Sequence, residues 1–206
     1  MRDATDVFSE WAGKGKDEGM ERGHAASVEE MLSLALATNN LSQRPFTAID
    51  IGCGNGWVVR KLQGMENCQS AEGVDGAESM IEKARSIDPK GNYSIAKLPQ
   101  WQPNNPVDFI HSMEFLYYLN DPVSMIKIIH DKWLKDGGVF VAGVDHYFEN
   151  KDSLQWPTAL DVHMTTLTQQ QWYEAMENAG FVNVKIAKTG VKDGFIGTLT
   201  MLGTKQ

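Results

Sequence analysis

Three glycines at alternate positions give this sequence its clearest chemical signal. Gly52, Gly54 and Gly56 follow a run rich in β-branched residues, and an amphipathic stretch begins at Trp57. Glycines let a backbone turn sharply and let a ligand approach it closely, and the first turn of a following helix offers unpaired N–H groups. A tight turn without a ligand is the alternative, but three closely spaced glycines carry an entropy cost that an ordinary turn does not need. The segment therefore predicts a ligand-binding loop between a strand and a helix.

Two carboxylates indicate which ligand this loop suits. A dinucleotide-binding loop has its third glycine where this chain has Trp57. Asp50, two places before the first glycine, would repel a pyrophosphate and attract an ammonium or sulfonium group. Asp75 ends the next predicted strand, where a carboxylate can accept both hydroxyls of a ribose, although a helix N-cap is an alternative role. The pair fits a nucleoside without a diphosphate that carries a cationic amino-acid tail.

Alternating strands and helices must position these residues. From Phe46 onward, short apolar runs alternate with stretches of helical period, which predicts an α/β fold with a parallel sheet covered on both faces. A short, turn-rich link joins the last two strands, so we expect them to form an antiparallel pair at the C-terminal edge of this doubly wound sheet. The expected strands are 47–53, 70–75, 93–96, 107–113, 139–145, 182–188 and 198–204, and the expected helices are 56–63, 77–87, 122–133 and 169–179.

Several helix ends carry their own sequence signals. Asp121 precedes a proline at the first helical position, and Thr168 with Gln171 predicts a capping box, with Gly180 at the far end of that helix. Ser27 with Glu30 predicts another capping box.

The first 44 residues form a separate segment in this interpretation. Apolar residues recur at helical spacing within 27–40, and Asn39–Asn40 would stop that helix. A shorter helix is expected over 3–11, with Val7, Phe8 and Trp11 on one face. We therefore divide the chain into an N-terminal helical cap, 1–44, and a ligand-binding domain, 45–206.

Composition limits the classes of function. The chain has 206 residues and a net charge of −8, with no basic block, which argues against broad contact with a nucleic-acid backbone. No run reaches the roughly 18 apolar residues that span a bilayer, and the N-terminus lacks the apolar core of a signal peptide. Cys53 and Cys68 are too few for a disulfide framework. We expect a soluble, cytoplasmic protein that acts on something small, with no membrane partner.

The motifs taken together resemble the small, single-domain class I S-adenosylmethionine-dependent methyltransferases of the type 11-like kind. The resemblance rests on the glycine loop after Asp50, on Gly73-Val-Asp75, and on Gly137-Gly138 before a strand, and it extends over about 45–204. It implies a seven-stranded Rossmann-like sheet with an antiparallel last strand and S-adenosylmethionine as the cofactor. The cofactor-binding residues that we assign are Trp11, Asp50, Gly52, Gly54, Gly56, Asp75, Gly76, Ala77, Ala96, Lys97, Leu98, Ser112, Met113 and Glu114.

This sequence departs from the family pattern at one place. Family members often carry an acidic residue before a Leu-Pro pair after the third strand, where it meets the adenine amino group. Here the residue before Leu98-Pro99 is Lys97. We expect Ser94 or the nearby backbone to serve the adenine instead.

Methyl transfer from a sulfonium requires little dedicated catalytic machinery. The protein mainly aligns the acceptor with the methyl group and excludes water, and a base is needed only if the acceptor must lose a proton. His146, after the fifth strand, is our candidate for that base, whereas His111, inside the fourth strand, is expected to be packed. The long connection 147–167, with Trp156, Asp161 and His163, is expected to form the acceptor wall. We expect no metal, although Asp145, His146 and Glu114 carry suitable ligand atoms.

The sequence therefore predicts a methyltransferase that acts on a small-molecule acceptor, with no nucleic-acid partner. Two alternatives remain open at this point. One is a non-catalytic module that binds S-adenosylmethionine, and the other is a nicotinamide-dependent oxidoreductase, which Trp57 disfavours.

Overall fold

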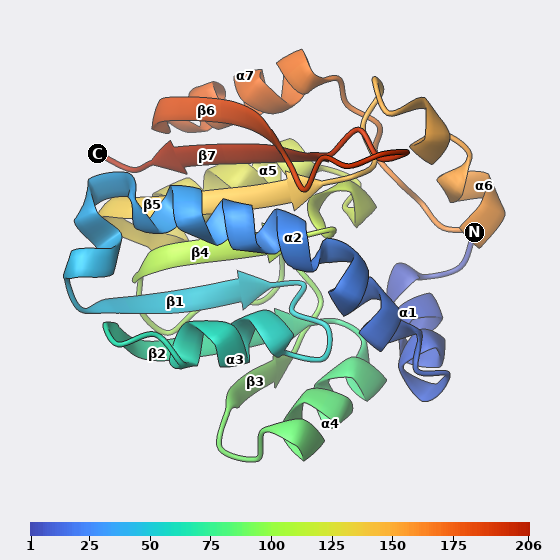
Figure 1. Cartoon of the computed structure of the whole chain (residues 1–206), viewed down its shortest axis with the longest axis horizontal. Helices are drawn as coiled ribbons and strands as arrows, with labels where there is room; N and C mark the ends of the chain where they lie inside the picture. Colours follow the sequence, from blue (N-terminus) through green and yellow to red (C-terminus); the bar gives the residue numbers. More distant parts are fainter.

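A seven-stranded sheet with the order β3-β2-β1-β4-β5-β7-β6 forms the centre of the computed structural model, which describes residues 1–206 (Figure 1). Neighbouring strands are parallel, except that β7 runs antiparallel to both β5 and β6. This confirms the predicted sheet and its C-terminal antiparallel pair. The strands are β1 (Phe46–Ile51), β2 (Cys68–Asp75), β3 (Asn92–Ile95), β4 (Val107–Met113), β5 (Leu134–Val144), β6 (Val182–Thr189) and β7 (Thr198–Thr204).

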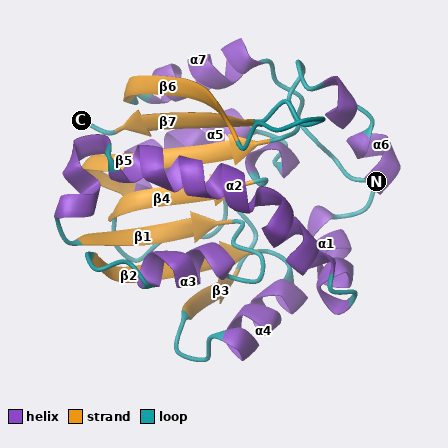
Figure 2. Ribbon diagram, viewed as in Figure 1, coloured by secondary structure: helices purple, strands orange, loops and turns teal.

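Helices cover the sheet on both faces, as Figure 2 shows. Helices α2, α3 and α4 enclose one apolar core, and α5 and α7 enclose the other. No helix is long and apolar enough to cross a membrane. The helices are α1 (Ala4–Gly13), α2 (Lys16–Leu36), α3 (Trp57–Gln63), α4 (Glu78–Ile87), α5 (Pro122–Ile128), which continues into a π-helical turn (Ile129–Trp133), α6 (Trp156–Leu160) and α7 (Gln169–Ala179), with 3-10 turns η1 (Thr38–Gln43), η2 (Leu116–Tyr118) and η4 (Lys151–Ser153).

The local end signals of two helices are confirmed. The Asp121 carboxylate accepts a hydrogen bond from the Ser124 amide, and Pro122 begins α5. Thr168 and Gln171 form the reciprocal capping box of α7, which ends at Gly180 in the left-handed region. Such signals are readable because donor and acceptor lie within one turn of the chain.

The predicted start of the second helix is wrong. Helix α2 begins at Lys16, so Ser27 lies inside it and is buried. The Ser27 hydroxyl donates to the Thr189 carbonyl at 3.3 Å and accepts from the Thr198 hydroxyl at 2.8 Å. The Glu30 carboxylate accepts from the Gly190 amide at 3.1 Å. Both side chains therefore fasten α2 to the β6–β7 hairpin and do not cap a helix.

The strand order places a crevice beside β1 and β4. From β1 the chain proceeds outward to β2 and β3, and it then returns to β4 on the other side of β1. Open α/β sheets bind ligands outside the carboxyl ends of strands at such a reversal. Helix α1 and the first half of α2 lie over this end of the sheet (Figure 1).

Candidate active site

One cavity of about 860 Å³ lies at the carboxyl ends of β1, β2 and β4. Gly56, Ala77 and Ser112 are predicted site residues that do not line it. The Ser112 hydroxyl instead donates to the Ile51 carbonyl at 3.2 Å. The predicted residues that do line the cavity are Trp11, Asp50, Gly52, Gly54, Asp75, Gly76, Ala96, Lys97, Leu98, Met113 and Glu114.

The three positions of the loop carry glycine for different structural reasons. Gly52, Gly54 and Gly56 all adopt positive φ, at 70°, 52° and 79°. A Cβ on Gly56 would lie 2.5 Å from the Tyr93 ring, and one on Gly52 would lie 2.6 Å from Phe115. A Cβ on Gly54 would meet nothing within 4 Å. Gly56 is thus required by packing, whereas Gly54 lies beside the open cavity.

The Asp75 carboxylate bridges the loop and the next helix. One oxygen accepts from the Gly54 amide at 2.9 Å, and the other accepts from the Ala77 amide at 2.8 Å. Burial raises the pKa of Asp75, although these amides favour the charged form. Each carboxylate oxygen can accept a further hydrogen bond. The N-cap residue of α4 is Ala77 and no side chain caps it, so Asp75 is not the helix cap, and its remaining lone pairs are available to a ligand.

Asp50 is buried in the cavity wall and pairs with a histidine. Its carboxylate lies 2.7 Å from the His111 Nδ1 atom, and both side chains are almost fully buried. His111 does not line the cavity, which agrees with the expectation that it is packed. Asp50 thus offers its remaining lone pairs to the cavity.

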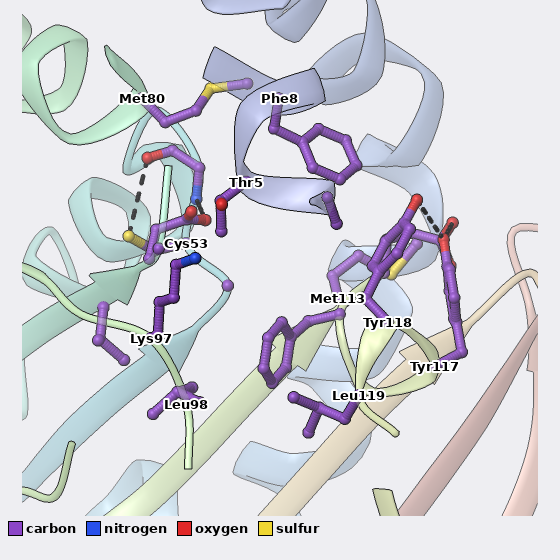
Figure 3. Close-up of a pocket in the computed structure, with 18 of the residues that line it drawn as sticks. Thr5, Phe8, Cys53, Met80, Lys97, Leu98, Met113, Tyr117, Tyr118 and Leu119 are labelled. Carbon is purple, nitrogen blue, oxygen red and sulfur yellow. Dashed lines mark hydrogen bonds between the residues drawn. The ribbon is translucent and has the colours of Figure 1, made fainter. Parts of the chain in front are cut away.

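Helices α1 and α2 supply further side chains to the cavity besides Trp11, among them Thr5, Phe8, Asp17 and His24. The Asn55 amide donates to the Asp17 carboxylate at 2.9 Å, which ties the glycine loop to α2. Figure 3 places Thr5 and Phe8 between two groups of side chains, with Cys53, Met80, Lys97 and Leu98 on one side and Met113, Tyr117, Tyr118 and Leu119 on the other.

Trp11 lines the cavity and its ring already contacts two other side chains. The Lys16 ammonium lies 5.0 Å from the centroid of the Trp11 ring, and Phe8 meets the ring edge-on. A cation is therefore already placed against this indole in the structure.

Glu114 lies at the end of β4, at the centre of a polar cluster in which Glu114 and His24 are half-buried and Asp145 is buried. Its backbone has a φ of 57°, an uncommon value for a residue with a side chain. Its carboxylate accepts from the Tyr117 hydroxyl at 2.7 Å and from the Asp145 amide at 2.5 Å. His24, from α2, lies 3.6 Å from the Asp145 carboxylate.

The pKa values of Glu114 and His24 are both raised, but for different reasons. Burial and the neighbouring Asp145 carboxylate raise the pKa of Glu114 to about 8, although His24 and Tyr117 favour the charged form. Burial alone would lower the pKa of His24, but Asp145 and Glu114 outweigh it and the net shift is upward. Glu114 is therefore a carboxyl group that can exchange a proton near neutral pH, in contact with the cavity.

His146 does not occupy the position expected of a base. It does not line the cavity, and it packs behind Tyr117 with ring centroids 5.4 Å apart. Its Nδ1 atom contacts the Ser153 carbonyl at 3.1 Å, and its Nε2 atom contacts the Thr166 hydroxyl at 2.7 Å. Because both ring nitrogens have internal partners, the geometry does not support His146 as the base, and Glu114 is the better-placed group.

The connection after β5 contributes only part of the expected acceptor wall. Trp156 and Leu160, on α6, line the cavity. Asp161 instead lies 3.5 Å from the N-terminal ammonium, and His163 contacts the Thr165 hydroxyl at 3.0 Å. Helix α6 itself was not expected from the sequence.

Comparisons with known proteins give a consistent result. A family model described as a methyltransferase domain matches residues 14–186. The trans-aconitate 2-methyltransferase of Agrobacterium fabrum is 26% identical, over 67% of this chain and 51% of that protein. The tRNA U34 carboxymethyltransferase of Haemophilus ducreyi is 24% identical, over 66% of this chain and 54% of that protein. The chain thus spans about half the length of the curated relatives it matches.

A solved structure resembles the chain over its whole length. It comes from the complex between the Haloferax volcanii Trm112 methyltransferase activator and a chain described as a methyltransferase. The similarity has a TM-score of 0.81 and 25% identity, and it covers 99% of this chain and 98% of the other.

The structural roles of Gly54 and Gly56 can be separated by comparing the free energies of unfolding of their alanine variants. Gly56→Ala combines a strained φ with a clash against Tyr93, so we expect it to lower the free energy of unfolding by about 2–4 kcal/mol. Gly54→Ala adds only the backbone strain, about 1–2 kcal/mol. Urea unfolding of both variants checks this. Equal losses would show that the Tyr93 contact imposes no constraint.

Glu114 is expected to destabilise the folded protein at alkaline pH. Because its folded-state pKa is about 8 and its usual value is 4.5, stability is lost as the pH rises between these values. Glu114→Gln keeps the shape without the charge and should raise the free energy of unfolding at pH 8 by about 1–3 kcal/mol, with little change at pH 4.5. Urea unfolding at both pH values, with the exposed Glu66→Gln as control, measures the effect. A variant less stable than the parent at pH 8 would contradict it.

Proposed function

The chain belongs to the class I S-adenosylmethionine-dependent methyltransferases, and from that membership we propose that it methylates a small-molecule acceptor held beside Glu114. The observation that carries this proposal is that one continuous cavity joins the glycine loop and Asp75 on one side to Glu114 and an aromatic wall on the other. A cofactor and a small acceptor would share this space.

The residues of the first side fit the cofactor. Asp75 has lone pairs left for the ribose hydroxyls, and the open space beside Gly54 lets a ligand approach the backbone. Met80 and Leu98 supply apolar surface on this side of the cavity and would contact the adenine. Asp50 provides a buried negative charge that suits the ammonium or sulfonium of the amino-acid tail.

The second side suits a small acceptor. Tyr117, Tyr118, Phe8 and Trp156 line it, and α1 covers the space between the two sides. Curated relatives named for trans-aconitate support a small molecule, whereas the relative named for tRNA supports a nucleic acid. The cavity favours the former, because its one lysine, Lys97, is already paired with Asp3 and leaves no free cation for a phosphate backbone.

The protein contributes to methyl transfer chiefly by positioning the acceptor. When bound, the cofactor supplies an electrophilic methyl group on a positively charged sulfur. The side chains of η2 and α6 then hold the acceptor in line with that group, and α1 excludes water, effects that can together contribute about 7–11 kcal/mol. Glu114 can take a proton from the acceptor where the reaction releases one.

Calorimetric titration with S-adenosylhomocysteine tests the cofactor half of this proposal. We expect micromolar binding, with no binding of NAD. Asp75→Ala should weaken the affinity by at least 100-fold, because it removes the ribose acceptors and releases the Gly54 amide. Gly54→Ala should also weaken it, because the added methyl enters the cavity.

Two controls keep this experiment interpretable. Circular dichroism of each variant verifies folding, and Gly54→Ala decides the question if Asp75→Ala does not fold. Unchanged affinity in folded Asp75→Ala would refute the assigned ribose site. Binding of NAD without S-adenosylhomocysteine would refute the proposed function.

A further inference from the structure

We infer that the acceptor is an organic amine that arrives as an ammonium ion and is recognised by Glu114, with the Asp145 carboxylate beside it. This inference rests on the proposed function and adds the charge class of the acceptor. It follows from a polar cluster in which two carboxylates face a single imidazole, from the absence of an unpaired lysine or arginine on the cavity wall, and from the aromatic surface beside Glu114.

The polar cluster contains two carboxylates and one imidazole. His24, Glu114 and Asp145 bring ligand atoms within 4.8 Å of one another. Asp145 is only 4% exposed, and its Oδ1 atom has no hydrogen-bond partner. A buried carboxylate oxygen without a donor is costly, and it adds to the excess of negative over positive groups beside Glu114. An ammonium group bound to Glu114, which lines the cavity, would offset that excess.

The other charged groups of the cavity already have partners. Asp3 pairs with Lys97, and Asp17 pairs with Lys83. Asp50 contacts His111, and Asp121 caps α5. No arginine lines the cavity. A carboxylate acceptor would therefore meet Glu114 with only the His24 imidazole, which already contacts Asp145, to offset the negative charge, and this is unfavourable in an enclosed site.

Aromatic rings surround the approach to Glu114. The rings of Tyr117 and Tyr118 have centroids 4.4 Å apart, and Phe8 meets Tyr118 edge-on at 5.2 Å. Phe115 and Trp156 extend this surface within the cavity. Aromatic faces attract organic cations and also cover the apolar body of an amine. Figure 3 shows Tyr117 and Tyr118 together on the side of the cavity opposite Lys97.

The same atoms fit a divalent metal less well. Both oxygens of Glu114 already accept hydrogen bonds, from Tyr117 and from the Asp145 amide. The remaining surroundings are aromatic and methionine side chains, whereas hard cations prefer several oxygen ligands. The geometry therefore favours an ammonium ion, and metal binding is an outcome of the test.

Glu114 also accounts for the proton in the reaction. The ammonium gives one proton to the Glu114 carboxylate, and the freed nitrogen lone pair forms the N–C bond while the methyl–sulfur bond breaks with its electrons left on sulfur. The product is a methylated ammonium, and the proton on Glu114 passes to solvent. A carboxyl group whose pKa is about 8 in the free protein can take up and release this proton near neutral pH.

Binding to the protein–S-adenosylhomocysteine complex tests this inference without turnover. Calorimetry compares phenethylamine and hexylamine with their carboxylate counterparts, 3-phenylpropionate and heptanoate, and with trans-aconitate, at pH 8.5 and 6.5. We expect at least one amine to bind tenfold or more tighter than its carboxylate counterpart at pH 8.5, and more weakly at pH 6.5. Glu114→Gln should weaken amine binding at least tenfold, while Glu66→Gln leaves it unchanged.

The outcomes separate this inference from the proposed function. Failure of the native protein to bind S-adenosylhomocysteine would refute the proposed function. Binding of S-adenosylhomocysteine combined with no amine binding, with equal or tighter carboxylate binding, or with no effect of Glu114→Gln would refute the amine acceptor alone. Stoichiometric binding of Mg²⁺ or Zn²⁺ that is lost in Glu114→Gln would also refute it and assign the cluster to a metal.

Discussion

The double hydrogen bond of the Asp75 carboxylate holds the cofactor side of this protein together. Its two oxygens accept from the amides of Gly54 and Ala77, so one buried side chain fixes both the glycine loop and the start of α4. The loop in turn carries Asn55, which binds Asp17 and so positions α2 over the cavity. The arrangement of the N-terminal helices thus depends on a carboxylate at the end of β2.

The cavity has two differently charged halves. On the β1–β2 side, the carboxylates have stable internal partners and lie ready for a nucleoside with a cationic tail. On the β4–β5 side, the half-buried Glu114 and the buried Asp145 lie close together with only His24 to offset them. Such a cluster costs stability, and a positive φ at Glu114 adds to the cost. Costs of this kind are commonly found where a protein binds or reacts.

Much of the fold could be predicted because its signals are local. The boundaries of β4, β7 and α7 agree with the predicted ranges, and the caps at Asp121 and Thr168 are present. The predicted capping box at Ser27 and Glu30 is wrong because those side chains bind the β6–β7 hairpin, far away in the chain. Helix α6 was missed for a different reason, because five residues give too short a periodic pattern to recognise.

The glycine loop, the carboxylate at the end of β2, the parallel sheet and the family could all be predicted from the amino-acid sequence, because each depends on residue types at short, fixed spacings. The folded chain was needed to show that His146 has both ring nitrogens bonded internally, and that His24, Glu114 and Asp145 meet. Glu114 and Asp145 directly follow β4 and β5, whose pairing brings them together, and the packing of α2 against β5 adds His24. These are long-range contacts, which sequence periodicity does not encode.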